Sequence, residues 1–454
     1  MSGAPRAWPE GVEAGADGAP RITADWLREP HLQALLEALA AADGKLAAAG
    51  AAHAAAEGGG SPARHEALVV GGAVRNTLLG VPVRDIDVAT SRAPEEAGRI
   101  AEALGHRVVP TGIRHGTITV VTPAGPYEVT TFRADVETDG RHARVAFTQD
   151  MRGDAERRDF TINALYARAD GRVVDPVGGL PDIATRTLRF IGDADARIVE
   201  DYLRILRFFR FHAHYGRGRP DAEGLRACAR HKGGLARLSV ERVWSELRRL
   251  LEAPEPGMTL LWMRTTGILT AILPESEKWG IDAIPALVGA ERDLGWRPDP
   301  MLRLMAMLPP DAERMQALAE RLKMSKAEAE RLVGWARTTA PRAELSGGGL
   351  AKRLYRDGER PVLDRLRLAL ASARGRGDLH DAGGFGELIA FAEGWRRPTF
   401  PLKGRDLIAA GMAPGPEVGE RLKALEDAWV EGGFAPDRHA LIASASSASA
   451  GGQG

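Results

Sequence analysis

The stretch Leu68–Ser91 limits the possible folds of this chain more than any other part of it. Its sequence, LVVGGAVRNTLLGVPVRDIDVATS, contains a short apolar run, two glycines, a helix-like segment and an alternating run in succession. These patterns predict a strand, a turn, a short helix and a second strand at Leu68–Val70, Gly71–Gly72, Val74–Leu79 and Arg84–Ala89. The order predicts the start of a small α/β module.

Two aspartates lie two residues apart in the second predicted strand. Because side chains alternate across a strand, Asp85 and Asp87 share one face while Ile86 and Val88 point to the other. Two neighbouring carboxylates repel each other and need a compensating cation. A divalent ion that prefers oxygen ligands, of which Mg²⁺ is the natural candidate, suits them. The alternative is a solvated, charged strand, which an Asp-x-Asp pair by itself more often indicates.

The glycines before the predicted helix indicate a phosphate site. Gly71 and Gly72 allow the backbone to approach a ligand closely, and the N–H groups that open the helix favour an anion. Arg75 adds a fork-shaped donor for the same phosphate. A glycine turn alone is more often an ordinary surface turn. Its combination with Asp85 and Asp87 at this spacing favours the handling of a nucleoside triphosphate.

Composition excludes several classes of protein. The 454 residues exceed the size of one ordinary core, so we expect several modules. Lys plus Arg and Asp plus Glu both number 61, so any basic surface must come from local clustering. The single cysteine, Cys228, has no disulfide partner, and no apolar run reaches about 18 residues, the length of a membrane span. These features predict a soluble, cytoplasmic protein with no membrane anchor.

The segments that follow complete the expected sheet. Three strand patterns and one helical pattern lie at Arg107–Val109, Thr117–Thr122, Tyr127–Phe132 and Pro94–Leu104. Glu128, in the last of these strands, is a candidate third carboxylate for the cluster of Asp85 and Asp87. The alternative for Glu128 is an edge-strand side chain in water.

The segment after this sheet carries further charged candidates. Residues 133–150, RADVETDGRHARVAFTQD, contain few core residues and predict a mobile loop. Arg157–Tyr166, RRDFTINALY, predicts a helix that Asp159 caps. Cations at a helix N-terminus are disfavoured by the helix dipole, so Arg157 and Arg158 are candidates for holding an anion. The alternative is two solvated arginines.

The strongest helical pattern is Glu200–Tyr215, EDYLRILRFFRFHAHY. Four charged residues repeat at every third position and stay neighbours on the helix surface: Asp201, Arg204, Arg207 and Arg210. A solvated face normally mixes Lys and Glu, so three arginines and one aspartate beside aromatic residues favour a binding surface. From about Asp221 onward the pattern is almost wholly helical. The predicted fold is therefore α+β, a small mixed β-sheet with helices, followed by an all-α region.

Motifs between Leu68 and Tyr215 together resemble the tRNA nucleotidyltransferase/poly(A) polymerase family of the DNA polymerase β superfamily, in its bacterial-eukaryotic class. The matching segments follow the family's order and read GGAVRN, LLG, RDIDVAT, TGIRHGTITV, YEVTTFR, RRDFTINAL, DPVGGLPDI and EDYLRILRFFRF. The segment PTGIRHGTIT resembles the CCA-adding branch, because bacterial poly(A) polymerases usually have a basic GRRFR-type segment there. One departure is Asn76, where the family usually has Asp.

The resemblance implies an enzyme that adds CCA, or part of it, to the 3′ end of tRNA from CTP and ATP. Asp85 and Asp87 would bind Mg²⁺, with Glu128 as the third acidic catalytic residue. The expected nucleotide contacts are Gly71, Gly72, Arg75, Arg158, Asp201, Arg204, Arg207 and Arg210. The alternatives within reach of the same fold are a poly(A) polymerase and a catalytically silent RNA-binding protein. The intact Asp85/Asp87 pair argues against the silent protein.

The resemblance also implies a division of the chain into successive parts. We expect an N-terminal extension with one helix and a flexible linker, then a nucleotidyltransferase head, then a helical neck with the nucleotide-recognition helix. A helical body and tail for tRNA binding and a disordered end would follow. The five parts are expected at residues 1–65, 66–195, 196–260, 261–443 and 444–454.

One pair in the arginine-rich helix suggests how a nucleotide is chosen without a nucleic-acid template. Asp201 and Arg204 lie one turn apart and place an acceptor beside a donor. Cytosine and adenine each offer a ring-nitrogen acceptor beside an amino donor, whereas uracil and guanine offer a ring N–H beside a carbonyl. We therefore expect this pair to select C and A and to reject U and G.

Overall fold

The computed structural model describes residues 8–15, 18–41, 65–139, 142–277 and 280–450. The linker expected before residue 65 falls almost entirely outside these described residues and stays a prediction. The chain divides into two compact units, composed of Met1–Leu238 with Trp262–Ala271 and of Ser239–Leu261 with Ile272–Gly454. All the site residues expected from the sequence belong to the first unit. The finer division into five parts stays a prediction.

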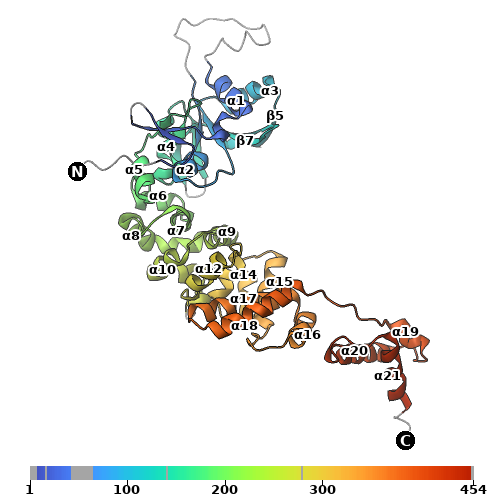
Figure 1. The fold of residues 1–454 in the computed structure, drawn as a ribbon. Coiled ribbons are helices and arrows are strands. Elements are labelled where there is room, and N and C mark those ends of the chain that lie inside the picture. Colours follow the sequence, from blue (N-terminus) through green and yellow to red (C-terminus); the bar gives the residue numbers. More distant parts are fainter. Residues whose placement is uncertain (1–7, 16–17, 42–64, 140–141, 278–279, 451–454) are drawn as a thin grey trace, which may run out of the picture. The chain divides into compact units, whose positions relative to one another are not determined.

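The first unit is built on a seven-stranded mixed sheet (Figure 1). Its strands lie in the order β11-β10-β3-β4-β7-β6-β5, with the bounds Val173–Val174, Tyr166–Ala167, Ala67–Val70, Asp87–Thr90, Gly125–Thr131, Thr117–Thr122 and Arg107–Gly112. Strands β4 and β7 are parallel, whereas every other neighbouring pair in this sheet is antiparallel. The predicted fold class, a small mixed sheet with helices, is confirmed.

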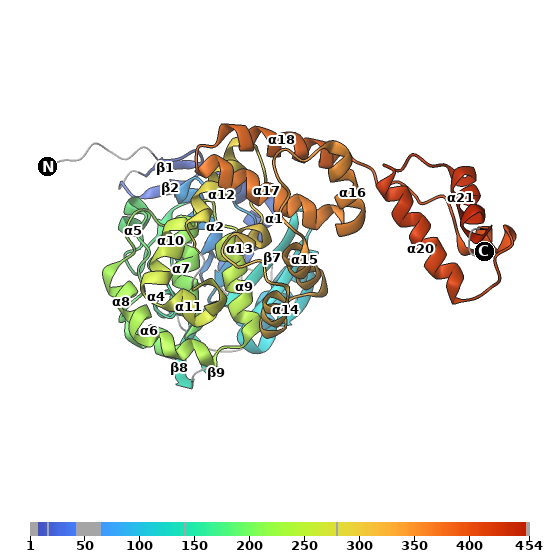
Figure 2. The same ribbon diagram turned by 90° about the horizontal axis from the view of Figure 1, so that it is seen from below.

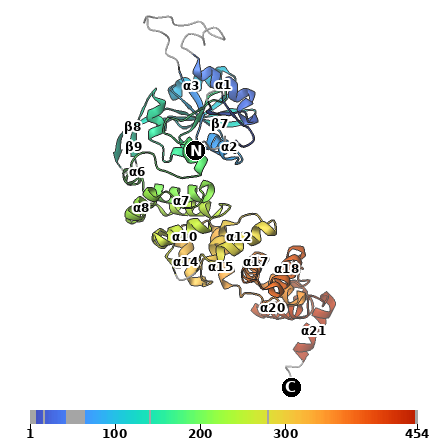
Figure 3. The same cartoon turned by 60° about the vertical axis from the view of Figure 1, so that its left-hand side comes forward.

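Helices α1 (Pro30–Ala40) and α3 (Pro94–Ala103) pack against each other and against this sheet (Figures 1 and 3). The N-terminus of α1 is fixed by Glu29, whose carboxylate accepts hydrogen bonds from the backbone N–H groups of His31 and Leu32. The apolar stripe of α1 is at most 1% exposed and consists of Leu32, Leu35, Leu36 and Leu39. This stripe supplies much of the core beneath β3 and β4.

Strands β8 (Arg133–Asp139) and β9 (His142–Phe147) form an antiparallel hairpin (Figure 3). The sequence predicts a mobile loop here, and that prediction is wrong. Its basis was the scarcity of apolar residues, but a two-stranded hairpin is held by backbone hydrogen bonds and needs no apolar face of its own. Low hydrophobicity therefore does not separate a loop from an exposed hairpin.

The helix expected at Arg157–Tyr166 is also absent. Helix α4 (Met151–Glu156) begins after Asp150, which caps its N-terminus by accepting from the backbone N–H groups of Arg152 and Gly153, and it ends before Arg157. The segment continues as a short 3₁₀ turn, Thr161–Asn163, and then enters the sheet as β10. The tertiary pairing of β10 with β3 thus overrides the local helical pattern.

The helix expected at Glu200–Tyr215 is present as α7 (Leu203–Tyr215), which begins three residues later than predicted, and a separate helix, α6 (Ala194–Glu200), precedes it. The break occurs at Asp201, whose backbone is extended and whose Oδ1 accepts from the backbone N–H of Leu203 at 3.0 Å. Aspartate competes with the helix backbone for hydrogen bonds, so it starts α7 rather than continuing α6. Figure 3 shows the two helices below the sheet.

The other described elements of the first unit are short. They are the hairpin strands β1 (Val12–Ala14) and β2 (Pro20–Ile22) and the helices α2 (Gly72–Leu79), α5 (Leu180–Thr185) and α8 (Ala222–His231). None of the helices in the described residues is long and apolar enough to cross a membrane.

The second unit is helical throughout its described residues, which confirms the predicted all-α region. Helix α17 (Glu359–Gly375) packs between α12 (Ala283–Asp293) and α18 (Leu379–Gly394) (Figure 2). Helices α10 (Gly257–Thr265) and α11 (Ile268–Ile272) belong partly to the first unit, which includes Trp262–Ala271. The other helices of the second unit are α9 (Val240–Leu251), α13 (Pro300–Ala306), α14 (Ala312–Arg321), α15 (Lys326–Arg337), α16 (Gly347–Asp357), α19 (Gly404–Ala409), α20 (Pro416–Glu431) and α21 (Arg438–Ala450). Residues 444–450, expected to be disordered, form the second half of α21.

Candidate active site

Two carboxylates meet at the parallel strands of the sheet. Asp87 is the first residue of β4, and its register partner on β7 is Glu128. Register partners on neighbouring strands project to the same face, so these two side chains lie next to each other. Asp85 is exposed and lies two residues before β4, which begins three residues later than the sequence predicts. The parallel pairing is what brings Glu128 to the Asp-x-Asp motif.

The electrostatics of this acidic group show that its negative charge is only partly compensated. Burial first, and then the neighbouring charge of Glu128, raise the pKa of Asp87 to about 6, with Asp85 adding to the shift and Arg158 opposing it. A carboxylate that is difficult to ionise beside two others is stabilised by a cation. The donor set consists of oxygens alone, which is the chemistry that Mg²⁺ prefers. Asp85 and Asp87 therefore fit the divalent ion that the sequence predicts.

The glycine turn before α2 lies close to these acids. Gly71 has a φ of +72° and a ψ of −113°, a conformation that side chains disfavour. A Cβ at Gly71 would lie 3.6 Å from Nη1 of Arg158 and 3.6 Å from the backbone oxygen of Asn163. Gly72 is the first residue of α2, so backbone N–H groups at the start of this helix are available to an anion. The turn thus needs glycine for its backbone conformation, whereas the space around it would admit a Cβ in ordinary contact with Arg158 and Asn163.

Arg158 connects the turn to the carboxylates. Its Nη2 donates to Oδ2 of Asp154 at 3.0 Å, and its Nε donates to the hydroxyl of Tyr166 at 3.2 Å. Burial by itself would lower the pKa of Arg158, but Tyr166 and Asp154 raise the pKa on balance. Arg158 is therefore a fixed, permanently charged group beside Gly71 and within electrostatic range of Asp87.

Arg75 is placed differently from the sequence expectation of an exposed phosphate donor. It is only 6% exposed, and its guanidinium donates to Oδ1 of Asn163 and to the hydroxyl of Tyr215, at 2.5 and 2.8 Å. The guanidinium carbon also lies 4.0 Å from the centre of the Tyr215 ring. Burial lowers the pKa of Arg75. These contacts tie α2 to the end of α7, and the expected triphosphate contact stays a prediction.

The charged residues of α7 gather around one aromatic ring. The guanidinium carbons of Arg207 and Arg210 lie 5.4 and 4.2 Å from the centre of the Phe211 ring, and that of Arg75 lies 5.2 Å from it. Arg207 also donates from Nε to Oδ2 of Asp159 at 2.7 Å. The face of α7 is thus a cationic surface that is anchored to the segment after α4.

The remaining pair of the expected stripe lies at the start of α7. Asp201 accepts from the backbone of Leu203, and Nη1 of Arg204 donates to the backbone oxygen of Arg197 at 2.7 Å and pairs with Glu200. Both side chains therefore have partners within the protein. Their expected contact with a base stays a prediction.

Sequence reasoning missed the residues that support the site. Four of them hold the arginines in place: Asp154, Asn163, Phe211 and Tyr215. Arg207, Phe211 and Tyr215 are spaced four residues apart, which indicates that they share one face of a helix. No local pattern indicated that Asn163 and Asp154 lie near the arginines.

Comparison with known proteins identifies the family. A family model described as the poly A polymerase head domain matches residues 67–189, and one described as a probable RNA and SrmB-binding site of polymerase A matches residues 220–279. The chain is 35% identical over 386 residues to the mitochondrial CCA tRNA nucleotidyltransferase 1 of Mus musculus, covering 83% of this chain and 86% of the relative. The chain belongs to the CCA-adding tRNA nucleotidyltransferase family. The family predicted from the motifs is confirmed.

A bacterial relative and two solved structures agree with this membership. The CCA-adding enzyme of Levilactobacillus brevis is 34% identical over 397 residues, which cover 84% of this chain and 94% of the relative. The Bacillus stearothermophilus CCA-adding enzyme, solved in complex with CTP, has a TM-score of 0.67 and 26% identity and covers 85% of this chain and 93% of that one. The Thermotoga maritima CCA-adding enzyme complexed with tRNA has a TM-score of 0.58 at 20% identity, covers 85% of this chain and 91% of that one, and supports the fold alone.

Proposed function

We propose that this protein adds CCA to the 3′ end of tRNA from CTP and ATP, without a nucleic-acid template. The observation that carries the proposal is the pairing of Asp87 with Glu128 beside the Gly71 turn, in a chain that belongs to the CCA-adding family. Acidic residues next to an anion-binding turn supply the two parts that nucleotidyl transfer requires, a metal site and a triphosphate site.

The metal site consists of Asp85 and Asp87, with Glu128 as the adjoining carboxylate. Mg²⁺ bound there supplies Lewis-acid activation of the RNA 3′-hydroxyl and charge neutralisation of the pyrophosphate leaving group. The carboxylates hold their negative charge close together on one face of the sheet, which is costly without a cation. Glu128 completes the acidic group as the third catalytic residue.

The residues around the metal site bind and orient the nucleotide. The backbone of Gly71 and Gly72 and the N-terminus of α2 hold the triphosphate, and Arg158 adds a fixed positive charge beside them. The start of α7 contacts the edge of the base, where Asp201 accepts a hydrogen bond from the amino group and Arg204 donates one to the ring nitrogen. Arg207, Arg210 and Arg75 provide the cationic wall around Phe211.

The helical region is the proposed binding surface for tRNA. Its first part coincides with the match at residues 220–279 to a model described as a probable RNA-binding site. We assign the nucleotidyltransferase head to residues 66–195, the neck to 196–260, and tRNA binding by the body and tail to 261–443. Relatives from mitochondria and from bacteria match at nearly equal identity, so the cytoplasmic location stays a prediction.

The product of the reaction tests the proposal directly. Purified protein is given tRNA that lacks its 3′ end, with CTP, ATP, both, or all four nucleotides, and the products are sequenced. Addition of C, C and A followed by a stop is the expected result. A long A tract on unrelated RNA would instead identify a poly(A) polymerase, addition of C alone would identify a partial enzyme, and RNA binding without any addition would identify a silent protein. The Asp87→Asn variant is the matched control for contaminating activity.

A further inference from the structure

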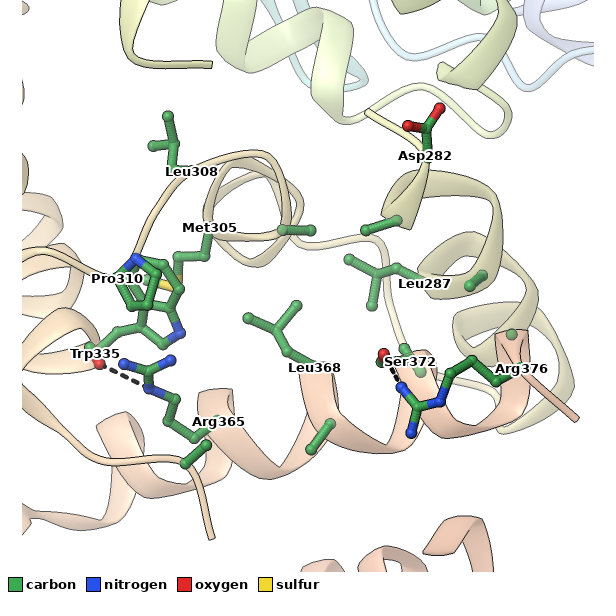
Figure 4. A pocket seen from close by; sticks show the side chains of 17 residues that line it. Asp282, Leu287, Met305, Leu308, Pro310, Trp335, Arg365, Leu368, Ser372 and Arg376 are labelled. Atoms are coloured by element: carbon green, nitrogen blue, oxygen red, sulfur yellow. Dashed lines mark hydrogen bonds between the residues drawn. The ribbon is translucent and has the colours of Figure 1, made fainter. Parts of the chain in front are cut away.

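The second unit contains a cavity that the proposed reaction leaves unused (Figure 4). Its volume is about 530 Å³, within the usual size of small-molecule sites of about 300–1,000 Å³. One face of α17 forms its floor through Arg365, Leu368, Ala369, Ser372 and Arg376. These positions follow helical spacing, so they form one continuous strip along the helix. We call this space the α17 cavity.

The walls of the α17 cavity are mainly apolar. They include Leu287 from α12, Met305 from α13, Leu308 just after α13, and Trp335 from α15. Figure 4 shows Leu287 and Leu368 near the middle of the cavity, with Trp335 and Arg365 together at one end and Ser372 and Arg376 at the other. The cavity thus has an apolar centre between two polar ends.

Trp335 has an unused hydrogen-bond donor at the first end. Its side chain is buried, with 2% exposure, and its indole nitrogen has no hydrogen-bond partner within the described residues. The nitrogen-bearing edge of the ring faces the side of the cavity on which Leu368 lies (Figure 4). A buried donor without an acceptor is unfavourable. The nitrogen itself exposes less than 1 Å², so an acceptor atom at this end of the cavity reaches it after a small rotation of the ring and then gains a hydrogen bond that the protein alone does not make.

Arg365 supplies a cation at the same end. Its guanidinium carbon lies 4.8 Å from the centre of the Trp335 ring, and its Nε donates to the backbone oxygen of Trp335 at 3.0 Å. Across the described part of the chain, no carboxylate forms an ion pair with Arg365. Burial lowers its pKa, and the nearby charge of Arg353 lowers it further. This half-buried cation has lost part of its hydration without gaining an anion.

The opposite end of the cavity is less favourable for an anion. The Nη1 of Arg376 donates to Oγ of Ser372 at 2.7 Å, and its Nη2 lies 3.9 Å from a carboxylate oxygen of Asp381. Its charge is therefore already partly neutralised. Ser372 is seven residues from Arg365, a separation of about 10 Å along the helix. The apolar centre is long enough for an extended aliphatic chain of medium length.

We propose that the α17 cavity binds an amphipathic monocarboxylate, a medium-chain fatty acid in chemical terms. Its carboxylate accepts from the indole N–H of Trp335 and from the guanidinium of Arg365. Its aliphatic chain lies along Leu368 and Leu287 toward Ser372. RNA is a poorer match, because its phosphates would place further charges against the apolar centre.

Calorimetric titration of the full-length protein with hexanoate, octanoate and decanoate, below their micelle concentrations, tests the proposal. We expect one molecule bound per chain, with an affinity that rises by up to about fourfold for each added methylene. Octanol, which lacks the charge, should bind at least tenfold more weakly than octanoate. The absence of saturable decanoate binding would overturn the proposal, as would equal affinities for octanol and octanoate.

Three variants locate the site. Trp335→Phe removes an N–H that has no partner in the protein and should weaken decanoate binding at least fivefold. Ala369→Phe, at a half-buried position, fills the cavity and should abolish binding while thermal unfolding stays cooperative. Arg374→Met is the matched control, because Arg374 is on α17 but pairs with Asp293 and does not line the cavity. The control should bind decanoate as the wild type does.

Unchanged decanoate binding in Ala369→Phe would show that the ligand lies elsewhere and would overturn the proposal. Equal weakening in Arg374→Met and Trp335→Phe would overturn it too, because Arg374 does not line the cavity and the loss would then not depend on the cavity. A third result would also contradict the proposal: the wild type does not bind decanoate, and Trp335→Phe and Ala369→Phe lose tRNA binding. That outcome would assign the cavity to RNA.

Discussion

The guanidinium carbon of Arg75 lies 4.0 Å from the centre of the Tyr215 ring, and Nη2 of Arg75 donates to the Tyr215 hydroxyl at 2.8 Å. Arg75 is in α2, directly after the glycine turn, whereas Tyr215 is the last residue of α7. This contact fixes the arginine-rich helix relative to the proposed triphosphate site. Arg75 thereby has a bracing function in addition to, or in place of, the triphosphate contact that the sequence predicts.

The Tyr215→Phe variant separates these two functions. It removes one hydrogen bond to a buried charge and keeps the ring, so we expect the free energy of unfolding to fall by about 1–2 kcal/mol. The KM for CTP should change by less than about threefold, because the charge of Arg75 is retained. Denaturant unfolding and steady-state kinetics measure the two quantities. A KM raised tenfold at unchanged stability would contradict bracing and would favour direct contact with the triphosphate.

The acidic residues give a prediction in which activity and stability change in opposite directions. Asp87→Asn should lower nucleotide transfer by about a hundredfold or more, through loss of metal positioning. In the absence of divalent ions, the same variant should be more stable than the wild type at pH 8. The folded-state pKa of Asp87, about 6, lies above its ordinary value of 3.8, so ionisation of this group destabilises the folded protein as pH rises from about 4 to 6 and beyond.

Thermal unfolding with and without Mg²⁺ measures this effect. With chelator at pH 8, Asp87→Asn should gain about 2 kcal/mol, and the gain should vanish below about pH 3, where the wild-type side chain is protonated in both states. Mg²⁺ should raise the melting temperature of the wild type and much less that of the variant. Normal turnover by Asp87→Asn in Mg²⁺ would remove Asp87 from the metal site.

The sequence was informative about this site wherever a local pattern decides the structure. Alternation placed Asp87 and Glu128 on strands, and the glycine pair placed the turn before α2. The adjacency of Asp87 and Glu128 itself required the parallel pairing of β4 with β7, which strand periodicity does not specify. Sequence patterns alone therefore indicated Glu128 only as a candidate third carboxylate on a neighbouring strand, and the family resemblance added its acidic role but no strand pairing.

The errors occurred where a single side chain or a distant partner decides the structure. Asp201 accepts a hydrogen bond from the backbone of Leu203, so the helix predicted to begin at Glu200 begins at Leu203 instead. The partners of Arg75 are 88 and 140 residues away in the sequence, so its burial had no local signal. The predictions of a mobile loop at 133–150 and of a helix at 157–166 were wrong for a related reason, because strand pairing outweighed local composition.

His212 in α7 gives a pH dependence of opposite sign to that of Asp87. Its side chain is 5% exposed, and burial lowers its pKa to about 4 from an ordinary value of 6.5. The unfolded chain therefore takes up the proton first as pH falls. The stabilising contribution of neutral His212 is complete above pH 6.5 and is lost progressively toward pH 4, by up to about 3 kcal/mol.

The His212→Gln variant isolates this contribution, because glutamine does not titrate. The difference in unfolding free energy between wild type and variant should change in favour of the variant between pH 7.5 and 4.5. Asp87 is present in both proteins and cancels in the comparison. A difference that is independent of pH would show that His212 is not buried in its neutral form.

Selection of the base by Asp201 and Arg204 competes with the structural contacts of both residues. Asp201 starts α7 through its bond to Leu203, so loss of activity in Asp201→Ala alone is ambiguous. Asp201→Asn keeps an oxygen for that backbone N–H but places an amide donor where a base amino group needs an acceptor. If Asp201 reads the base, both variants should raise incorporation of UTP or GTP relative to CTP and ATP. One bidentate base contact is worth roughly 1–3 kcal/mol, or about 5- to 150-fold in this ratio.

Single-turnover incorporation of each of the four nucleotides measures the ratio independently of product release. Glu200→Gln is the matched control, because Glu200 pairs with Arg204 but is not expected to contact the base. It should keep the ratio among the nucleotides, even if its overall rate changes. If Asp201→Asn keeps the wild-type ratio while Asp201→Ala loses rate and stability, Asp201 only starts α7. Base selection would then need another hydrogen-bond acceptor. Arg204 has only donors, whereas recognition of cytosine or adenine requires a donor for the ring nitrogen and an acceptor for the amino group.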